Sequence, residues 1–105
     1  MENKTGTIDL SSVRVIEGIV KLKGTCTFQL FSSDLSADTT VLVEGSLDGG
    51  TSWGALKESG SPITDTLVQG EVNLIGIESD APMKIRVRFD GATTGNVTYY
   101  HTLTA

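Results

Sequence analysis

A chain of 105 residues with 38% hydrophobic and 20% charged side chains is long enough for one domain around a single core. Thirteen acidic and eight basic residues give a net charge of -5, which argues against non-specific nucleic-acid binding because such binding depends on basic patches. A single cysteine excludes an internal disulfide and a cysteine-based zinc site. We expect no cofactor and no metal.

The first twelve residues are polar apart from Ile8 and Leu10. We therefore predict a flexible N-terminal arm at 1–12 and a single domain at 13–105. The start of the chain lacks the apolar core of a signal peptide, and no run of about 18 apolar residues occurs. These features predict a protein that is made in the cytoplasm and has no membrane partner.

The segment 13–23 is rich in β-branched residues, but the alternation of its apolar positions changes parity midway. Val13 and Val15 share one parity, whereas Val20 and Leu22 share the other. We therefore expect a one-residue slip within 17–19, as a bulge or a tight corner.

The next alternating segment runs from Thr25 to Phe31 and places Cys26, Phe28 and Leu30 on one face. We expect this face to be buried, with the Cys26 thiol as an inert core group. A polar loop at 32–38 follows.

The middle of the chain predicts a hairpin and two further strands. Val41 and Val43 share the inner face of a strand at 39–47, and the turn at 48–50 returns the chain into a strand at 53–58. A short edge strand is expected at 63–67, where Pro62 is tolerated. A strand at 71–77 carries Val72 and Leu74 on one side.

Two strands complete the chain. Met83, Ile85, Val87 and Phe89 alternate with three basic residues, which is typical of a half-buried antiparallel strand. In the last strand, at 97–104, the residues of one parity are Val97, Tyr99, His101 and Leu103, opposite Thr98, Tyr100, Thr102 and Thr104.

No segment has the three- and four-residue apolar spacing of a helix, so we predict almost no helix. Seven to nine short strands separated by turn signals predict an all-β fold, an antiparallel β-sandwich or jelly-roll.

The turn after the strand at 39–47 has a distinctive spacing. Ser46, Asp48, Gly50, Ser52 and Trp53 form a Ser-x-Asp-x-Gly-x-Ser-Trp pattern. It resembles the Asp-box hairpin of sialidases and other β-proteins, with Ser52 in place of the usual Thr. The resemblance implies a structural turn, formed by Asp48, Gly49, Gly50 and Trp53, rather than a catalytic site. A single copy occurs here.

No catalytic constellation is predicted, and we expect a protein that is not an enzyme. His101 is the only histidine, no nucleophile motif accompanies it, and we expect it at a partly exposed position of the sheet. Most aspartates fall in turns, where they accept hydrogen bonds from backbone amides. Asp48 with Gly49 and Gly50 is too sparse for a calcium loop.

Two surface features are candidates for binding. Lys84, Arg86 and Arg88 form a basic stripe, which is either a solvated face paired with Glu44 or Glu71 or a docking surface for an acidic partner. Trp53 with Tyr99 or Tyr100 could stack on a sugar. Consecutive tyrosines point to opposite faces, so at most one could join Trp53, and core packing is the favoured role.

The segment 39–104 contains the stretches Thr-Val-Leu-Val-Glu-Gly-Ser-Leu-Asp-Gly-Gly-Thr-Ser-Trp, Met-Lys-Ile-Arg-Val-Arg-Phe and Gly-Asn-Val-Thr-Tyr-Tyr. The resemblance of this segment as a whole is to small virion proteins of tailed bacteriophages. It implies a capsid decoration (cement) protein of the virion, with the major capsid protein or another virion protein as partner. A homo-oligomer is expected, with a trimer favoured. The alternative is a carbohydrate-binding or tail- or fibre-associated module.

Overall fold

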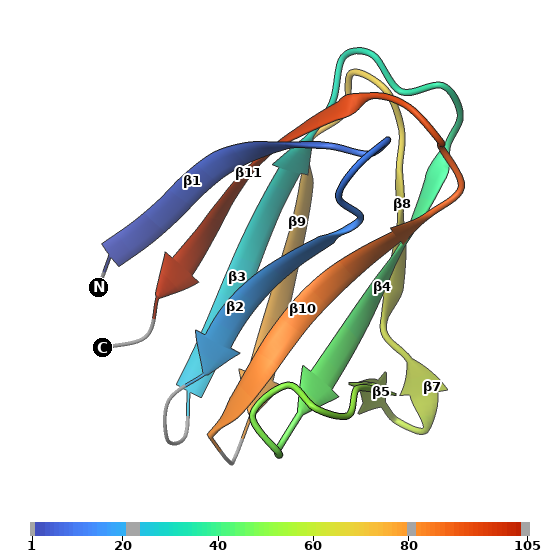
Figure 1. Ribbon diagram of the computed structural model, residues 1–105. Helices are drawn as coiled ribbons and strands as arrows, with labels where there is room; N and C mark the ends of the chain where they lie inside the picture. The colour runs from blue at the N-terminus through green and yellow to red at the C-terminus, as the bar shows by residue number, and fades with distance from the viewer. Residues whose placement is uncertain (1, 21–23, 80–81, 104–105) are drawn as a thin grey trace.

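The computed structural model describes residues 2–20, 24–79 and 82–103 (Figure 1). These residues form eleven β-strands and no helix, so the predicted all-β class is confirmed. None of the described segments is a helix that could cross a membrane.

The first sheet has four strands in the order β1-β11-β3-β9. Every neighbouring pair in it is antiparallel. Its strands are β1 (Glu2–Asp9), β11 (Asn96–Leu103), β3 (Gly24–Phe31) and β9 (Asn73–Ser79). The first and last strands of the chain are therefore neighbours, and β9 forms the opposite edge.

The second sheet has the order β2-β10-β4, and β4 also pairs with β5 and β8. All of these pairings are antiparallel. Its strands are β2 (Val15–Val20), β10 (Met83–Asp90), β4 (Thr39–Ser46), β5 (Gly54–Ala55) and β8 (Thr64–Leu67). Between β5 and β8 the chain forms a small separate hairpin of β6 (Lys57–Glu58) and β7 (Ser61–Pro62).

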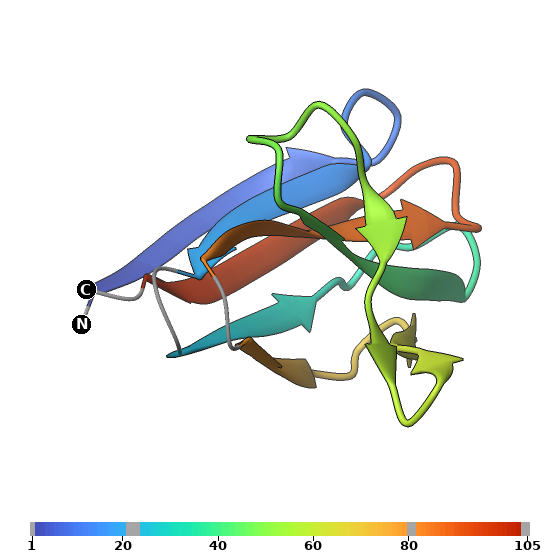
Figure 2. The same cartoon turned by 90° about the horizontal axis from the view of Figure 1, so that it is seen from below.

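The two sheets face each other across one apolar core. Figure 2 shows β3 and β9 in a layer apart from β2, β10 and β4. The predicted inward faces are confirmed, because side chains of alternating parity are buried along β3, β4 and β10. They are Cys26, Phe28 and Leu30, then Val41 and Val43, and then Ile85, Val87 and Phe89.

The expected N-terminal arm is wrong for the described residues. Glu2–Asp9 is strand β1, and each of its eight residues has a partner in β11. The Tyr99 side chain lies against Gly6, where a Cβ would come 2.7 Å from the tyrosine oxygen. Leu10 is fully buried, and its amide donates to the Gly95 carbonyl at 2.9 Å. The polar composition of 1–12 is therefore that of an exposed edge strand whose end is anchored by one buried leucine.

The expected slip within 17–19 is also wrong. All of β2 pairs with β10 in one continuous register, with Ile16 and Gly18 on the inner face. A Cβ at Gly18 would lie 3.0 Å from Phe28 Cζ and 3.1 Å from Cys26 Sγ. The inward position is thus filled from β3. Val13 lies before β2 and is 42% exposed, and Val15 has the parity opposite to Ile16, so neither valine marks the inward face of the strand. Residues 21–23 lie outside the described residues.

The segment at 53–58 is interrupted rather than one strand. Gly54 and Ala55 pair with β4, whereas Lys57 and Glu58 pair with β7. Leu56 lies between them and donates its amide to the Val43 carbonyl at 3.0 Å. The edge strand predicted at 63–67 is present as β8.

Candidate functional site

The turn after β4 is held by the Asp48 carboxylate. Its Oδ1 accepts hydrogen bonds from Ser46 Oγ at 2.6 Å and from the amides of Thr51 and Ser52 at 3.1 and 2.9 Å. The bond from Ser46, with those from Ser52, holds the pKa of Asp48 far below its usual range. Gly49 and Gly50 have φ values of 79° and 98°, which a residue with a Cβ rarely adopts.

Trp53 lies against this turn and against β10. Its indole N–H donates to the Gly50 carbonyl at 3.1 Å. The Arg86 guanidinium carbon is 4.3 Å from the ring centroid, a cation–π contact. One face of the indole is therefore covered by Arg86.

The basic stripe lies on the outer face of β10 and shares one acidic partner. Nε of Arg86 is 2.8 Å, and Nε of Arg88 is 3.3 Å, from the same Oε1 of Glu44. Glu44 is directly opposite Arg86 in the β4–β10 register. Glu71, the other expected partner, lies just before β9 in the first sheet. The stripe is therefore partly neutralised on its own sheet, and the Lys84 side chain extends it toward Gly50.

His101 is 2% exposed, which corrects the partly exposed position expected for it. Its ring lies 5.4 Å from that of Phe28 and is stacked on Tyr99 at 5.9 Å, between ring centroids. Nδ1 is 3.3 Å from the Thr102 carbonyl oxygen, and Nε2 is buried without a hydrogen-bond partner. The imidazole is thus a core group rather than an accessible acid or base.

The two consecutive tyrosines point to opposite sides of the first sheet. Tyr99 packs against the core, whereas Tyr100 is 46% exposed on the outer face. Tyr100 is opposite Gln29, which is opposite Leu74, so the three form one row across the sheet. A cavity of about 150 Å³ lies over this row and is also lined by Thr27, His101 and Thr102. Trp53 lies against the second sheet, so it forms no common platform with either tyrosine.

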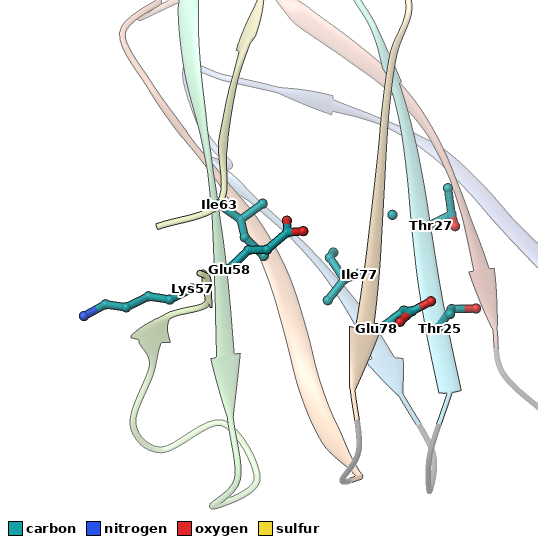
Figure 3. A pocket seen from close by; sticks show the side chains of 8 residues that line it. Thr25, Thr27, Lys57, Glu58, Ile63, Ile77 and Glu78 are labelled. Carbon is teal, nitrogen blue, oxygen red and sulfur yellow. The ribbon is translucent and has the colours of Figure 1, made fainter. Parts of the chain in front are cut away.

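A larger cleft of about 580 Å³ lies between β9 and the β6–β7 hairpin (Figure 3). It is lined by Thr25, Thr27, Lys57, Glu58, Ile63, Gly76, Ile77 and Glu78. Our sequence interpretation did not identify it. The one local signal is the turn expected at 59–62, of which 59–60 form the turn in the structure; it predicts a short hairpin but not what that hairpin faces.

The Cys26 thiol belongs to the core. Cys26 is fully buried, and burial raises the pKa of its thiol. Within the described ranges, no three His, Cys, Asp or Glu side chains are grouped so that they could hold a metal ion.

Comparison with models of protein families, with curated proteins and with solved structures gives no match.

Proposed function

We propose that this protein is a non-enzymatic structural component of a bacteriophage virion, a decoration protein that binds the capsid surface and stabilises it. The observation that supports this is the order of its strands. If β5 to β8 count as one segment at the edge of β4, the strands run 1-8-3-6 in the first sheet and 2-7-4-5 in the second. We propose that this is a jelly-roll, a fold used by viral capsid and lectin domains.

The use of the acidic side chains favours binding over catalysis. Hydrogen bonds lower the pKa of Asp9, Asp34 and Asp48, with Ser11, Asn96 and Ser46 as the main donors. These carboxylates are therefore ionised acceptors for turns, not proton donors poised near neutral pH. His101 and Cys26 are enclosed in the core. The described surface can therefore bind a partner through its shape, its charged side chains and the edge of a sheet.

A rigid attachment follows from the pairing of β1 with β11. Because Glu2–Asp9 is already held in the sheet, the protein would meet the capsid with preformed surfaces rather than with an arm that orders on binding. We propose the major capsid protein as the partner. Copies around a symmetric capsid position would form a homo-oligomer, with a trimer favoured.

Two measurements test this function. Light scattering gives the oligomeric state of the free protein, and co-sedimentation with tailed-phage heads assembled without it gives binding and stoichiometry. We expect saturation at a fixed ratio of copies to capsid subunits and a higher disruption temperature of the decorated heads. Heads that neither bind the protein nor gain stability would contradict the proposal.

A carbohydrate-binding module of a tail or fibre is the second candidate, and Tyr100 favours it. Tyr100, which is exposed, lines one shallow cavity with Gln29, Thr27 and Thr102, residues whose side chains carry amide and hydroxyl groups. Aromatic faces and neutral hydrogen-bonding groups are a combination that suits a neutral sugar. A glycan array probed with the protein and with Tyr100→Ala would show specific signals that the variant loses. Equal signals from both would exclude this site.

A further inference from the structure

We propose that the cleft between β9 and the β6–β7 hairpin binds an extended peptide segment that carries lysine or arginine, which adds to the first sheet as a further strand. This inference deepens the proposed function, because it names the kind of segment by which a virion partner would be held. It rests on four features of the cleft: a sheet edge, a fixed opposite wall, an opening on both sides of β9, and acidic side chains.

The sheet edge is β9. In the described structure β9 is the end strand of its sheet and pairs along its length with β3. Its first residue, Asn73, is covered on the other side, because the side-chain Nδ2 of Asn73 donates to Asp65 Oδ2 at 2.8 Å and to the Thr66 carbonyl at 2.9 Å. Farther along, 76–78 line the cleft. An edge strand presents backbone donors and acceptors on its outer side, and an extended peptide can pair with them.

The opposite wall is fixed to the second sheet. Ile63 donates its amide to the Leu56 carbonyl at 2.9 Å, and Leu56 donates to the Val43 carbonyl at 3.0 Å. Val43 in turn donates to the Ile63 carbonyl at 3.2 Å. These bonds fasten the base of the β6–β7 hairpin to β4, so the cleft is already formed in the absence of a ligand. Its volume, about 580 Å³, lies in the usual range for ligand sites.

The lining residues lie on both sides of the edge strand. In Figure 3, Ile77 points from β9 toward Ile63 and Glu58, whereas Glu78 points to the other side of β9 with Thr25. A peptide in an extended conformation also directs successive side chains to opposite sides. A β-branched residue would contact Ile63 and Ile77, and its neighbours would contact Glu78 and the threonines. This two-sided lining fits a strand better than a compact ligand.

The charge of the cleft selects a basic segment. Glu58 and Glu78 line it from opposite walls, while the Lys57 side chain points away (Figure 3). A Cβ at Gly76 would have one neighbour within 4 Å, Thr27 Oγ1 at 3.8 Å, so there is room there for a side chain of the peptide. The net charge of -5 adds a long-range attraction for a basic segment.

The test uses the full chain and the peptide acetyl-Thr-Lys-Val-Lys-Val-Thr-amide. We expect binding by calorimetry, with NMR shift changes and slower amide exchange concentrated in 76–78. The double variant Glu58→Lys/Glu78→Lys should weaken binding by about tenfold or more through the loss of two charge pairs. The control Glu71→Lys/Asp90→Lys makes the same change of charge at two exposed residues that do not line the cleft and should bind like the unchanged protein.

Further outcomes decide between occupants. A peptide with N-methyl groups on both valines and both lysines should not bind, because it lacks the alternate amides that face β9 in either orientation; equal binding would overturn the proposal and leave charge attraction alone. If light scattering shows an oligomer that the Glu58→Lys/Glu78→Lys variant converts to monomer, the occupant is a second copy, and the proposal fails. Heads bound equally by both double variants would refute the inference and leave the decoration function standing. Peptide binding without head binding would support the peptide site and contradict the decoration function.

Discussion

Gly18 is a sharp test of the packing between the two sheets. Replacing it with alanine places a Cβ 3.0 Å from Phe28 Cζ and 3.1 Å from Cys26 Sγ. Both neighbours are fully buried core side chains of β3 and have little room to move. Either β2 or β3 must therefore shift, or the two side chains must leave their preferred rotamers.

The expected cost follows from these distances. Overpacking of a core costs about 1–3 kcal/mol. Replacing a glycine with alanine also raises the free energy of unfolding by about 0.4–1 kcal/mol, because alanine has fewer conformations in the unfolded chain. We therefore expect Gly18→Ala to lower the free energy of unfolding by about 1–2 kcal/mol, which corresponds to a fall in Tm of about 4–16 °C for a domain of this size.

Urea unfolding followed by circular dichroism measures this effect, with Gly76→Ala as the matched control. Gly76 also lies within a strand, but a Cβ there meets only Thr27 Oγ1 at 3.8 Å, so the control should be as stable as the unchanged protein or slightly more stable. In the background of Cys26→Ala, the added Gly18→Ala change should cost less, because one of its two close neighbours has lost its sulfur. If Gly18→Ala proves as stable as Gly76→Ala, β2 does not pack on β3 in this way.

Three further changes probe other parts of the molecule. Glu44→Gln leaves Arg86 and Arg88 without their shared carboxylate and should lower the free energy of unfolding by about 1 kcal/mol, a value near the surface range because Arg88 is 40% exposed; an unchanged urea midpoint would contradict it. Because the pKa of Asp48 is lowered on folding, its contribution is complete above its ordinary value of 3.8 and is lost as pH falls through the folded value. Asp48→Asn should therefore lose part of the acid dependence of stability, and unchanged slopes below about pH 4 in both proteins would refute this. The Cys26 thiol should react with Ellman's reagent only after unfolding in guanidinium, since it is fully buried with a raised pKa, and rapid reaction of the native protein would show that the core is open.

Much of the fold could be predicted from sequence because its strands alternate with period two. Ile85, Val87 and Phe89 alternate with charged residues, so the inward face of β10 follows directly from the pleat. The same rule failed at Gly18, where the inward position has no side chain and the space is filled by Phe28 from another strand. Alternation reports which side chains are apolar, and it carries no information on what a neighbouring strand supplies.

Polar composition misled the interpretation of β1 and His101 for a related reason. β1 is an edge strand in which Lys4, Thr5 and Thr7 are exposed, so the segment resembles a solvated arm although each of its residues is in register with β11. His101 has the parity of Val97, which predicts the inner face, but its polar ring suggested exposure. In both cases the position within the sheet determines burial, and the residue type does not.

The cleft could not be predicted because its lining comes from three separate segments, 25–27, 57–63 and 76–78, which belong to different sheets. Glu58 and Ile63 are placed by the attachment of the hairpin to β4, and Ile77 and Glu78 by the pairing of β9 with β3. No local pattern relates these segments. By contrast, the Asp48 turn is formed by neighbours in sequence, so a motif of eight residues was sufficient to locate it.

The two candidate binding regions are adjacent on the first sheet, and this determines how they must be separated by experiment. Thr27 lines both the cleft at β9 and the shallow cavity at Tyr100, so a change at Thr27 would affect a peptide and a sugar alike. Glu58 lines only the cleft, and Tyr100 lines only the shallow cavity. Glu58→Lys should therefore weaken binding of a basic peptide and leave glycan binding intact, whereas Tyr100→Ala should do the opposite. If each variant weakened both ligands, the two cavities would act as a single site that extends across β3 and β9.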